Sequence, residues 1–277
     1  MAGPELTSVR SPRVSAARRL AKRAFRAADG RFLAEGPQAV REAAATPNVL
    51  VEVFATAEAA ARHADILEAS RQAGAAIAIV SGEVLASIAQ TVTPQGIAAV
   101  CRRVDVLLDD VLARSPRLVT VLVDARDPGN TGTVIRTADA AGADAVLMTG
   151  DSVDPYNGKC VRATAGSLFH VPIVLAGAIE PSVERLKAAG LAVVAADGGG
   201  DVDLDEALDS GRLARPTAWL FGNEAWGLPD AVRALADAVI RVPIHGRAES
   251  LNLASAAAVC LYASARAHRH RPRAALP

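Results

Sequence analysis

The chain has 277 residues, of which 51% are hydrophobic, and its 30 basic and 30 acidic side chains give a formal net charge of zero. It has no run of about 18 apolar residues and no apolar signal-peptide core near its start, so we expect a cytoplasmic protein without a membrane span. The scattered Cys101, Cys160 and Cys260 form no C-x-x-C pair, which predicts neither a disulfide framework nor a metal site.

The neutral total conceals two basic ends. Residues 1–31 carry eight basic and two acidic side chains, and Arg266, Arg269, Arg271 and Arg273 follow near the C-terminus without an acid. Basic ends on an acidic body are expected of a polyanion binder, although a solvated helix face and a frayed tail explain them equally well. Only 3% of residues are aromatic, which argues against a surface that stacks bases widely.

In chain order, residues 13–28 predict a basic helix with Leu20 and Phe25 as core contacts. After a short extended piece at 32–37, strands are expected at 49–54, 75–80 and 95–101, and helices at 38–45, 58–73 and 83–90. This alternation predicts an α/β unit of about 100 residues. Residues 104–116 are the expected linker, because the composition shifts there and Pro116 breaks any helix.

The alternation then restarts. Strands are expected at 118–123, 145–148, 171–175, 191–196, 218–221 and 238–242, with helices between them and a last, Ala-rich helix from residue 253 to about 270. The second half is therefore predicted to form a mainly parallel sheet covered by helices on both faces.

Three loops of the second half carry the polar residues of interest: 127–136, 221–229 and 242–254. Open α/β sheets bind ligands beyond the carboxyl ends of their strands, where these loops should meet. Taken singly, each polar residue has an ordinary explanation. Asn130 can cap a helix, Arg136 can lie on a surface, and Ser250 and Asn252 can cap the last helix.

Together and in this order, the loops resemble the three signature motifs of the SpoU (TrmH-like) family of RNA ribose 2′-O-methyltransferases, in the SPOUT superfamily. The motifs are Asn130-x-Gly132-x-x-x-Arg136, Leu220-Phe-Gly-Asn-Glu-Ala-Trp-Gly-Leu228 and Val242-Pro-Ile-x-Gly-x-x-Glu-Ser-Leu-Asn-Leu-Ala254. The first hundred residues resemble the L30e-like domain often attached to this family, including Phe32-Leu-Ala-Glu-Gly36 and Thr93-Pro-Gln-Gly96. The resemblance implies an L30e-like RNA substrate-binding domain (1–103), a linker (104–116) and a methyltransferase domain with a deep trefoil knot (117–277).

The resemblance also implies a homodimer that uses S-adenosylmethionine, with the cofactor held around Gly222, Val242, Ile244, Leu251 and Leu253. The implied catalytic residues are Arg136, Asn130, Glu224, Ser250 and Asn252. Because arginine rarely gives up a proton, we expect Arg136 to bind a phosphate and stabilise alkoxide charge, with phosphate or water accepting the proton. Glu224 is expected to orient Arg136 or its neighbours, and Ser250 and Asn252 to hold the loops together.

Basic residues of the N-terminal helix and the segment before it are expected to position RNA by its phosphates: Arg10, Arg18, Arg19, Lys22, Arg23 and Arg26. The length and the L30e-like domain resemble bacterial 23S rRNA enzymes, including those of the thiostrepton-resistance type, so 23S rRNA is the expected substrate and tRNA the alternative. A non-catalytic RNA-binding protein of the same fold is a second alternative. A dinucleotide-dependent oxidoreductase would use Pro128–Gly132 as a phosphate loop, but this loop lacks the third glycine and the acid about 20 residues on.

Overall fold

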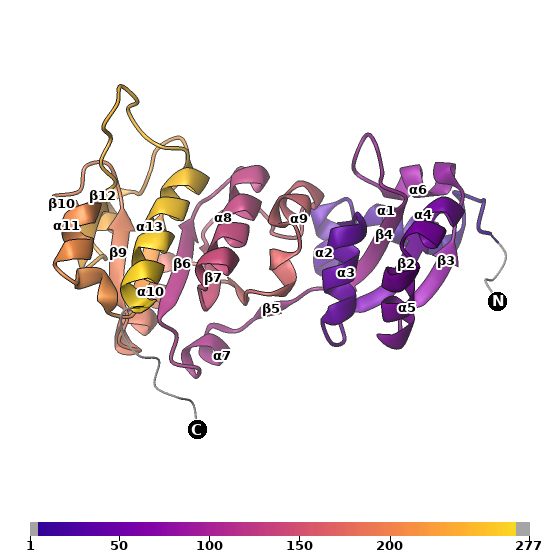
Figure 1. Cartoon of the computed structure of the whole chain (residues 1–277), viewed down its shortest axis with the longest axis horizontal. Coiled ribbons are helices and arrows are strands. Elements are labelled where there is room, and N and C mark those ends of the chain that lie inside the picture. The colour runs from indigo at the N-terminus through magenta and orange to yellow at the C-terminus, as the bar shows by residue number, and fades with distance from the viewer. Residues whose placement is uncertain (1–4, 270–277) are drawn as a thin grey trace. The chain divides into compact units, whose positions relative to one another are not determined.

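The computed structural model describes residues 5–269 (Figure 1), so Arg271 and Arg273 of the basic C-terminal end lie outside the described residues. The chain divides into two compact units. The first unit consists of the chain up to Val104 together with Asp154–Phe169, and the second of Asp105–Val153 and the chain from His170 onward. Among the described residues, no helix combines the length and the apolar character that crossing a membrane requires.

The first unit is built on a mixed four-stranded sheet. Its strands follow the order β1 (Arg31–Glu35), β4 (Ile97–Arg102), β2 (Leu50–Ala55) and β3 (Ala76–Ile79), with β4 antiparallel to both of its neighbours and β2 parallel to β3. Leu33, Phe54, Val84 and Ile88 are buried in its core. The helices of this unit are α1 (Pro12–Arg19), α2 (Arg23–Asp29), α3 (Pro37–Ala45), α4 (Ala57–Arg62), α5 (Ala64–Gln72), α6 (Gly82–Ile88) and α9 (Gly158–Thr164).

The basic N-terminal segment differs from the single helix expected over 13–28, because it forms α1 and α2 with a break between them. The guanidinium of Arg26 donates Nη1–H bonds to the carbonyls of Leu20 (2.9 Å) and Ala21 (2.8 Å), at the end of α1. A helix end leaves such carbonyls without intrahelical partners, so Arg26 satisfies them and fixes the break. Leu20 is buried as expected, whereas Phe25 is exposed and lies under the guanidinium of Arg19.

The second unit contains an eight-stranded sheet in which every pairing is parallel, which confirms the expected mainly parallel sheet. The strand order is β10 (Val202–Asp203), β12 (Ala238–Arg241), β9 (Ala192–Ala196), β11 (Thr217–Phe221), β6 (Leu118–Val123), β7 (Ala145–Thr149), β8 (Ile173–Leu175) and β5 (Asp105–Val106). Its α-helices are α7 (Leu108–Leu112), α8 (Pro128–Ala141), α10 (Ile179–Ala188), α11 (Leu204–Asp209), α12 (Asp230–Arg233) and α13 (Leu253–Arg269).

The central strands are buried on both faces, as expected when helices cover a parallel sheet. Helix α13, yellow in Figure 1, packs against α8, β6 and β11. The indole N–H of Trp219 in β11 donates to the hydroxyl of Ser264 in α13 at 2.8 Å, and both residues are fully buried. This bond satisfies two buried polar groups and fixes α13 on the centre of the sheet.

Residues 104–116, which we expected to be a linker, instead contribute two elements to the second unit. Strand β5 pairs in parallel with β8, and Leu108 and Val111 of α7 are buried in the core. Conversely, Asp154–Phe169 belongs to the first unit: the ring of Phe32 lies 4.7 Å from that of Tyr156 and 6.0 Å from that of Phe169. Helix α9 comes between β7 and β8 in sequence like any crossover helix, so alternation alone does not reveal this.

Candidate active site

The three motif loops follow neighbouring strands of the second unit. Strands β12, β9, β11 and β6 lie side by side and run in the same direction, so their carboxyl ends share one edge of the sheet. The chain order reverses here, since β7 and β8 lie on one side of β6 whereas β11, β9 and β12 lie on the other. A ligand site is expected at such a switch point.

A cavity of about 470 Å³ opens at this edge. Its walls include all five residues expected to hold the cofactor, which are Gly222, Val242, Ile244, Leu251 and Leu253, and three of the expected catalytic residues, Glu224, Ser250 and Asn252. Asn130 and Arg136 are not among its walls. The other lining residues are Ala196, Asp197, Gly198, Phe221, Asn223, Ala225, Gly227, Glu249 and Ala256.

A tight turn after β11 forms one wall of the cavity. Asn223 and Gly227 exchange two backbone hydrogen bonds of 3.0 and 2.8 Å, and the Asn223 side chain donates to the Asp124 carbonyl at 2.6 Å. A Cβ atom on Gly222 would lie 2.2–2.5 Å from the backbone of Gly227 and Leu228, which leaves no room for a side chain. The turn therefore requires glycine at position 222.

The side chain of Asn130 connects the three motif loops. Its Nδ2 donates to Glu224 Oε1 at 3.1 Å, and its Oδ1 accepts a hydrogen bond from Asn252 Nδ2 at 3.0 Å. Asn252 also caps α13, because its Oδ1 accepts the Ala254 N–H at 2.9 Å. The first turn of α8, the turn after β11 and the start of α13 are thus joined by one polar network.

The start of α8 fixes the position of Asn130. The Asp127 side chain accepts the Asn130 N–H at 2.7 Å as the N-cap, and Pro128 occupies the first turn, where its missing N–H costs nothing. Further along the helix, Arg136 is exposed and forms no hydrogen bond or ion pair with the part of the chain that the structure describes.

Glu224 and Ser250 differ in the contacts that they form. Glu224 accepts hydrogen bonds from Asn130 and, more weakly, from the Arg126 N–H at 3.5 Å, and within residues 5–269 it forms no hydrogen bond or ion pair with Arg136. Ser250 is exposed, and its hydroxyl neither caps α13 nor bonds to another described residue. Of the two residues expected to hold the loops together, Asn252 alone does so.

The comparison with family models decides the identity of the second unit. The model of the SpoU rRNA Methylase family matches residues 117–262. This protein belongs to the SpoU rRNA Methylase family. A second model, the MRM3-like substrate binding domain, matches residues 11–99.

Named relatives match nearly the whole chain. The 23S rRNA (guanosine(2553)-2'-O)-methyltransferase RlmP of Bacillus subtilis is 33% identical over 93% of this chain and 98% of its own. The AdoMet-bound rRNA methyltransferase from Sinorhizobium meliloti has a TM-score of 0.81 and 31% identity, covering 95% of this chain and 97% of its own. The AdoMet complex of AviRb from Streptomyces viridochromogenes has a TM-score of 0.78 and 28% identity, covering 95% of this chain and all of its own.

Sequence reasoning missed several residues at this SpoU site. Arg126 lies 5.1 Å over the ring of Trp226, next to Glu224, and forms an exposed stacked pair. Asp197 lines the cavity and pairs with Arg233 at 3.3 Å. The hydrogen bond to Asp230 and the charge of Asp197 raise the pKa of the Arg233 guanidinium. The position of Asp197 directly after β9 was the signal available for it.

Proposed function

We propose that this protein transfers the methyl group of S-adenosylmethionine to a ribose 2′-hydroxyl of 23S rRNA. The observation that carries the proposal is the Asn130 network, which joins the three family motifs beside the 470 Å³ cavity. The names of the relatives agree with it: one methylates a 2′-oxygen of 23S rRNA, and two structures hold AdoMet.

The residues of the cavity fit S-adenosylmethionine, which when bound supplies a methyl group on a sulfonium centre. Gly222 lets the turn after β11 close tightly, so backbone groups rather than a side chain line that wall. Val242, Ile244, Leu251 and Leu253 give the cavity an apolar surface. A mostly apolar cavity with a few polar groups is the usual environment of such a ligand.

We assign the handling of RNA at the reacting centre to Arg136. Its guanidinium has no partner among the described residues, so it is available to a phosphate beside the target ribose and to developing alkoxide charge. It does not act as the base, because a guanidinium in a protein rarely gives up a proton, and the proton passes to phosphate or water. Asn130, Glu224 and Asn252 act by holding α8, the turn after β11 and the start of α13 in fixed positions, whereas Ser250 is assigned a substrate-side contact.

We assign RNA binding to the first unit as an L30e-like domain. Arg10, Arg18, Lys22 and Arg23 are exposed there, and a row of exposed basic side chains binds phosphates without reading sequence. Arg19 is also exposed, but both oxygens of Asp29 accept hydrogen bonds from it. Arg26 is withdrawn from this set, because its side chain is 4% exposed and paired with Asp154 at 2.7 Å.

Two architectural proposals accompany the function. Helix α13 follows β12 in sequence but packs on β11 and β6, and the match of residues 117–262 to the SpoU family supports a deep trefoil knot in this unit. Val259 and Tyr262 are 42% and 51% exposed on α13, and such an apolar face supports a homodimer. Analytical sedimentation of the wild type and of Tyr262→Glu tests the dimer. We expect the wild type to sediment as a dimer and the variant as a monomer. A monomeric wild type would exclude the dimer.

The function is tested by incubating the protein with radiolabelled S-adenosylmethionine and unmethylated total bacterial RNA. Size separation and alkaline hydrolysis should show label in large-subunit rRNA at an alkali-resistant linkage, because a 2′-O-methyl blocks the attack that cleaves RNA. Label in tRNA would keep the reaction and replace the substrate. Absence of label despite cofactor binding would favour an RNA-binding protein without methyl transfer.

A further inference from the structure

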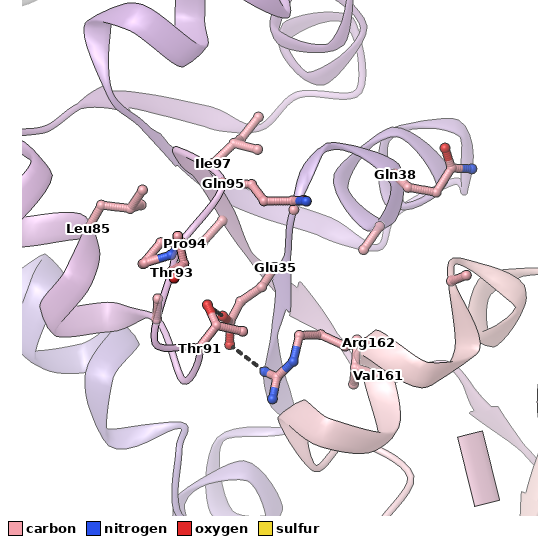
Figure 2. A pocket seen from close by; sticks show the side chains of 15 residues that line it. Glu35, Gln38, Leu85, Thr91, Thr93, Pro94, Gln95, Ile97, Val161 and Arg162 are labelled. Carbon is pink, nitrogen blue, oxygen red and sulfur yellow. Dashed lines mark hydrogen bonds and ion pairs between the residues drawn. The ribbon is translucent and has the colours of Figure 1, made fainter. Parts of the chain in front are cut away.

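The first unit contains a cavity of about 320 Å³ whose walls bring together the two N-terminal motif stretches (Figure 2). Glu35 and Gly36 come from the end of β1, and Thr93, Pro94 and Gln95 come from the loop before β4. Helix α9 closes the other side with Val161 and Arg162, together with Ala165 at its C-cap. All of these residues lie within the first unit.

The wall contains a buried carboxylate with unused acceptor capacity. The Glu35 side chain is 6% exposed. Its Oε1 accepts the Gln90 N–H at 3.0 Å and Arg162 Nη1–H at 3.2 Å, whereas its Oε2 accepts, from residues 5–269, only the Thr91 hydroxyl at 3.2 Å. A carboxylate offers about four lone-pair directions, so one acceptor position remains on Oε2.

Arg162 also has unused hydrogen-bond donors. Its side chain is 31% exposed and donates one N–H to Glu35, and a guanidinium carries five such donors. Replacing a buried ion pair by apolar side chains is often neutral or stabilising, so stability alone does not require this pair. The pair therefore presents an acceptor and a donor, side by side, to a ligand.

The remaining walls combine apolar side chains with one amide. Leu85, Ile97 and Val161 supply apolar surface, and the exposed Gln95 supplies an amide (Figure 2). Gly36 has a φ of +90°, and a Cβ atom there would lie 2.6 Å from Gln95 Oε1, so glycine allows the Gln95 side chain to lie against the end of β1. Apolar walls with a few placed polar groups are typical of small-ligand sites.

We propose that this cavity binds one unstacked nucleobase of the RNA, a guanine or a uracil. The inference rests on the proposed function, which makes RNA the substrate. Glu35 disfavours a phosphate and accepts an N–H, while Arg162 donates to a carbonyl oxygen. Guanine and uracil place a ring N–H beside a carbonyl, whereas neutral adenine and cytosine have no ring N–H. Proteins read RNA sequence mainly at such splayed-out bases, through hydrogen bonds to their edges.

The test is a chemical footprint on in-vitro-transcribed bacterial 23S rRNA bound to the full-length protein. Kethoxal modifies the N1–N2 edge of guanine, and a water-soluble carbodiimide modifies N3 of uracil. We expect the wild type to protect an unpaired guanine or uracil that becomes reactive with Glu35→Gln, together with an RNA affinity lower by about tenfold or more. The matched control is Glu52→Gln, which removes the ion pair with Arg13 in the same unit.

The exposed Gln95→Ala provides a second variant in case Glu35→Gln melts at a much lower temperature, and it should weaken the same protection. Identical footprints for the wild type and both variants, or no protected guanine or uracil, would overturn the proposal. Failure of the proposed function is distinguished by the methyl-transfer assay. In that case the wild type would transfer no methyl group to RNA, whatever its footprint shows.

Discussion

Asn252 donates a side-chain amide N–H to Asn130 Oδ1 at 3.0 Å, although the two lie 122 positions apart in sequence. Each asparagine also performs a second task, since Asn130 donates to Glu224 and Asn252 caps α13. A substitution at either asparagine should therefore also alter the position of the other side chain.

A double-mutant cycle measures this coupling. Asn130→Ala and Asn252→Ala should each lower kcat/KM for RNA about five- to tenfold, because a neutral hydrogen bond contributes about 1 kcal/mol. The double variant should lose less than the product of the two factors, since both changes remove the same bond. Thr133→Ala, on the exposed side of α8, is the control. Multiplicative losses would contradict the coupling.

Arg136→Ala should reduce methyl transfer by about 10²–10³ while S-adenosylmethionine still binds, because the residue lies outside the cavity walls and acts on the RNA. Single-turnover assays and calorimetry measure the two quantities separately. Arg136→Lys keeps the charge but not the planar fork, and should recover part of the rate. An active Arg136→Ala variant would remove the residue from the mechanism.

Gly222→Ala should abolish cofactor binding, because the added Cβ atom must displace the backbone at Gly227 and Leu228. Gly177→Ala is the matched control in the same unit, since a Cβ atom there meets no atom within 4 Å. Calorimetric titration with S-adenosylmethionine reports the difference, and thermal melting reports whether the fold survives. Unchanged affinity in Gly222→Ala would show that the turn does not shape the cofactor site.

Arg23 and Arg26 should behave in opposite ways, although they lie only three positions apart. Arg26→Ala leaves Asp154 and two helix-end carbonyls without their partner, so we expect a loss of about 3–5 kcal/mol in the free energy of unfolding. Arg23→Ala should change stability by no more than about 0.5 kcal/mol and reduce the salt dependence of RNA binding by about one ion. Denaturant titration and binding at several salt concentrations separate the two effects.

His268 should make the stability of the second unit sensitive to acid. Burial lowers the pKa of His268 below its ordinary value of 6.5, and the ring bonds to the Arg215 carbonyl through Nε2 at 3.0 Å. The unfolded chain therefore binds more protons, so the contribution is present above pH 6.5 and is lost as the pH falls towards the lowered value. The melting temperature should drop between pH 7 and 5.5, and less so in His268→Gln. Equal drops would contradict this role.

Much of the second unit could be predicted because its strands are short buried apolar runs, and β6 occupies the predicted residues 118–123. The start of α8 was predicted less accurately. Asp127-Pro-Gly was interpreted as part of a loop, although an Asp N-cap followed by Pro also begins a helix, here at Pro128. The helix expected over 58–73 is divided at His63, where the backbone leaves the helical region.

The sequence predicted that the three loops lie together, because ligand-binding loops of parallel sheets follow the carboxyl ends of the strands. This rule does not predict which side chains in the loops contact one another. The direction of Arg136 depends on the register of α8, which the sequence left open, and the side chain proves to be exposed. Charge alone also could not separate Arg26 from its neighbours, because burial and a partner 128 residues away decide its role.

The assignment of Asp154–Phe169 to the first unit means that the gene cannot be cut at one point into two independent modules. A fragment ending near residue 103 would lack Tyr156 and Phe169 against Phe32, the Arg162 partner of Glu35 and the Asp154 partner of Arg26. The complementary fragment would carry the same segment with its apolar side uncovered. Domain exchange with a relative should therefore transplant residues 154–169 along with the N-terminal hundred.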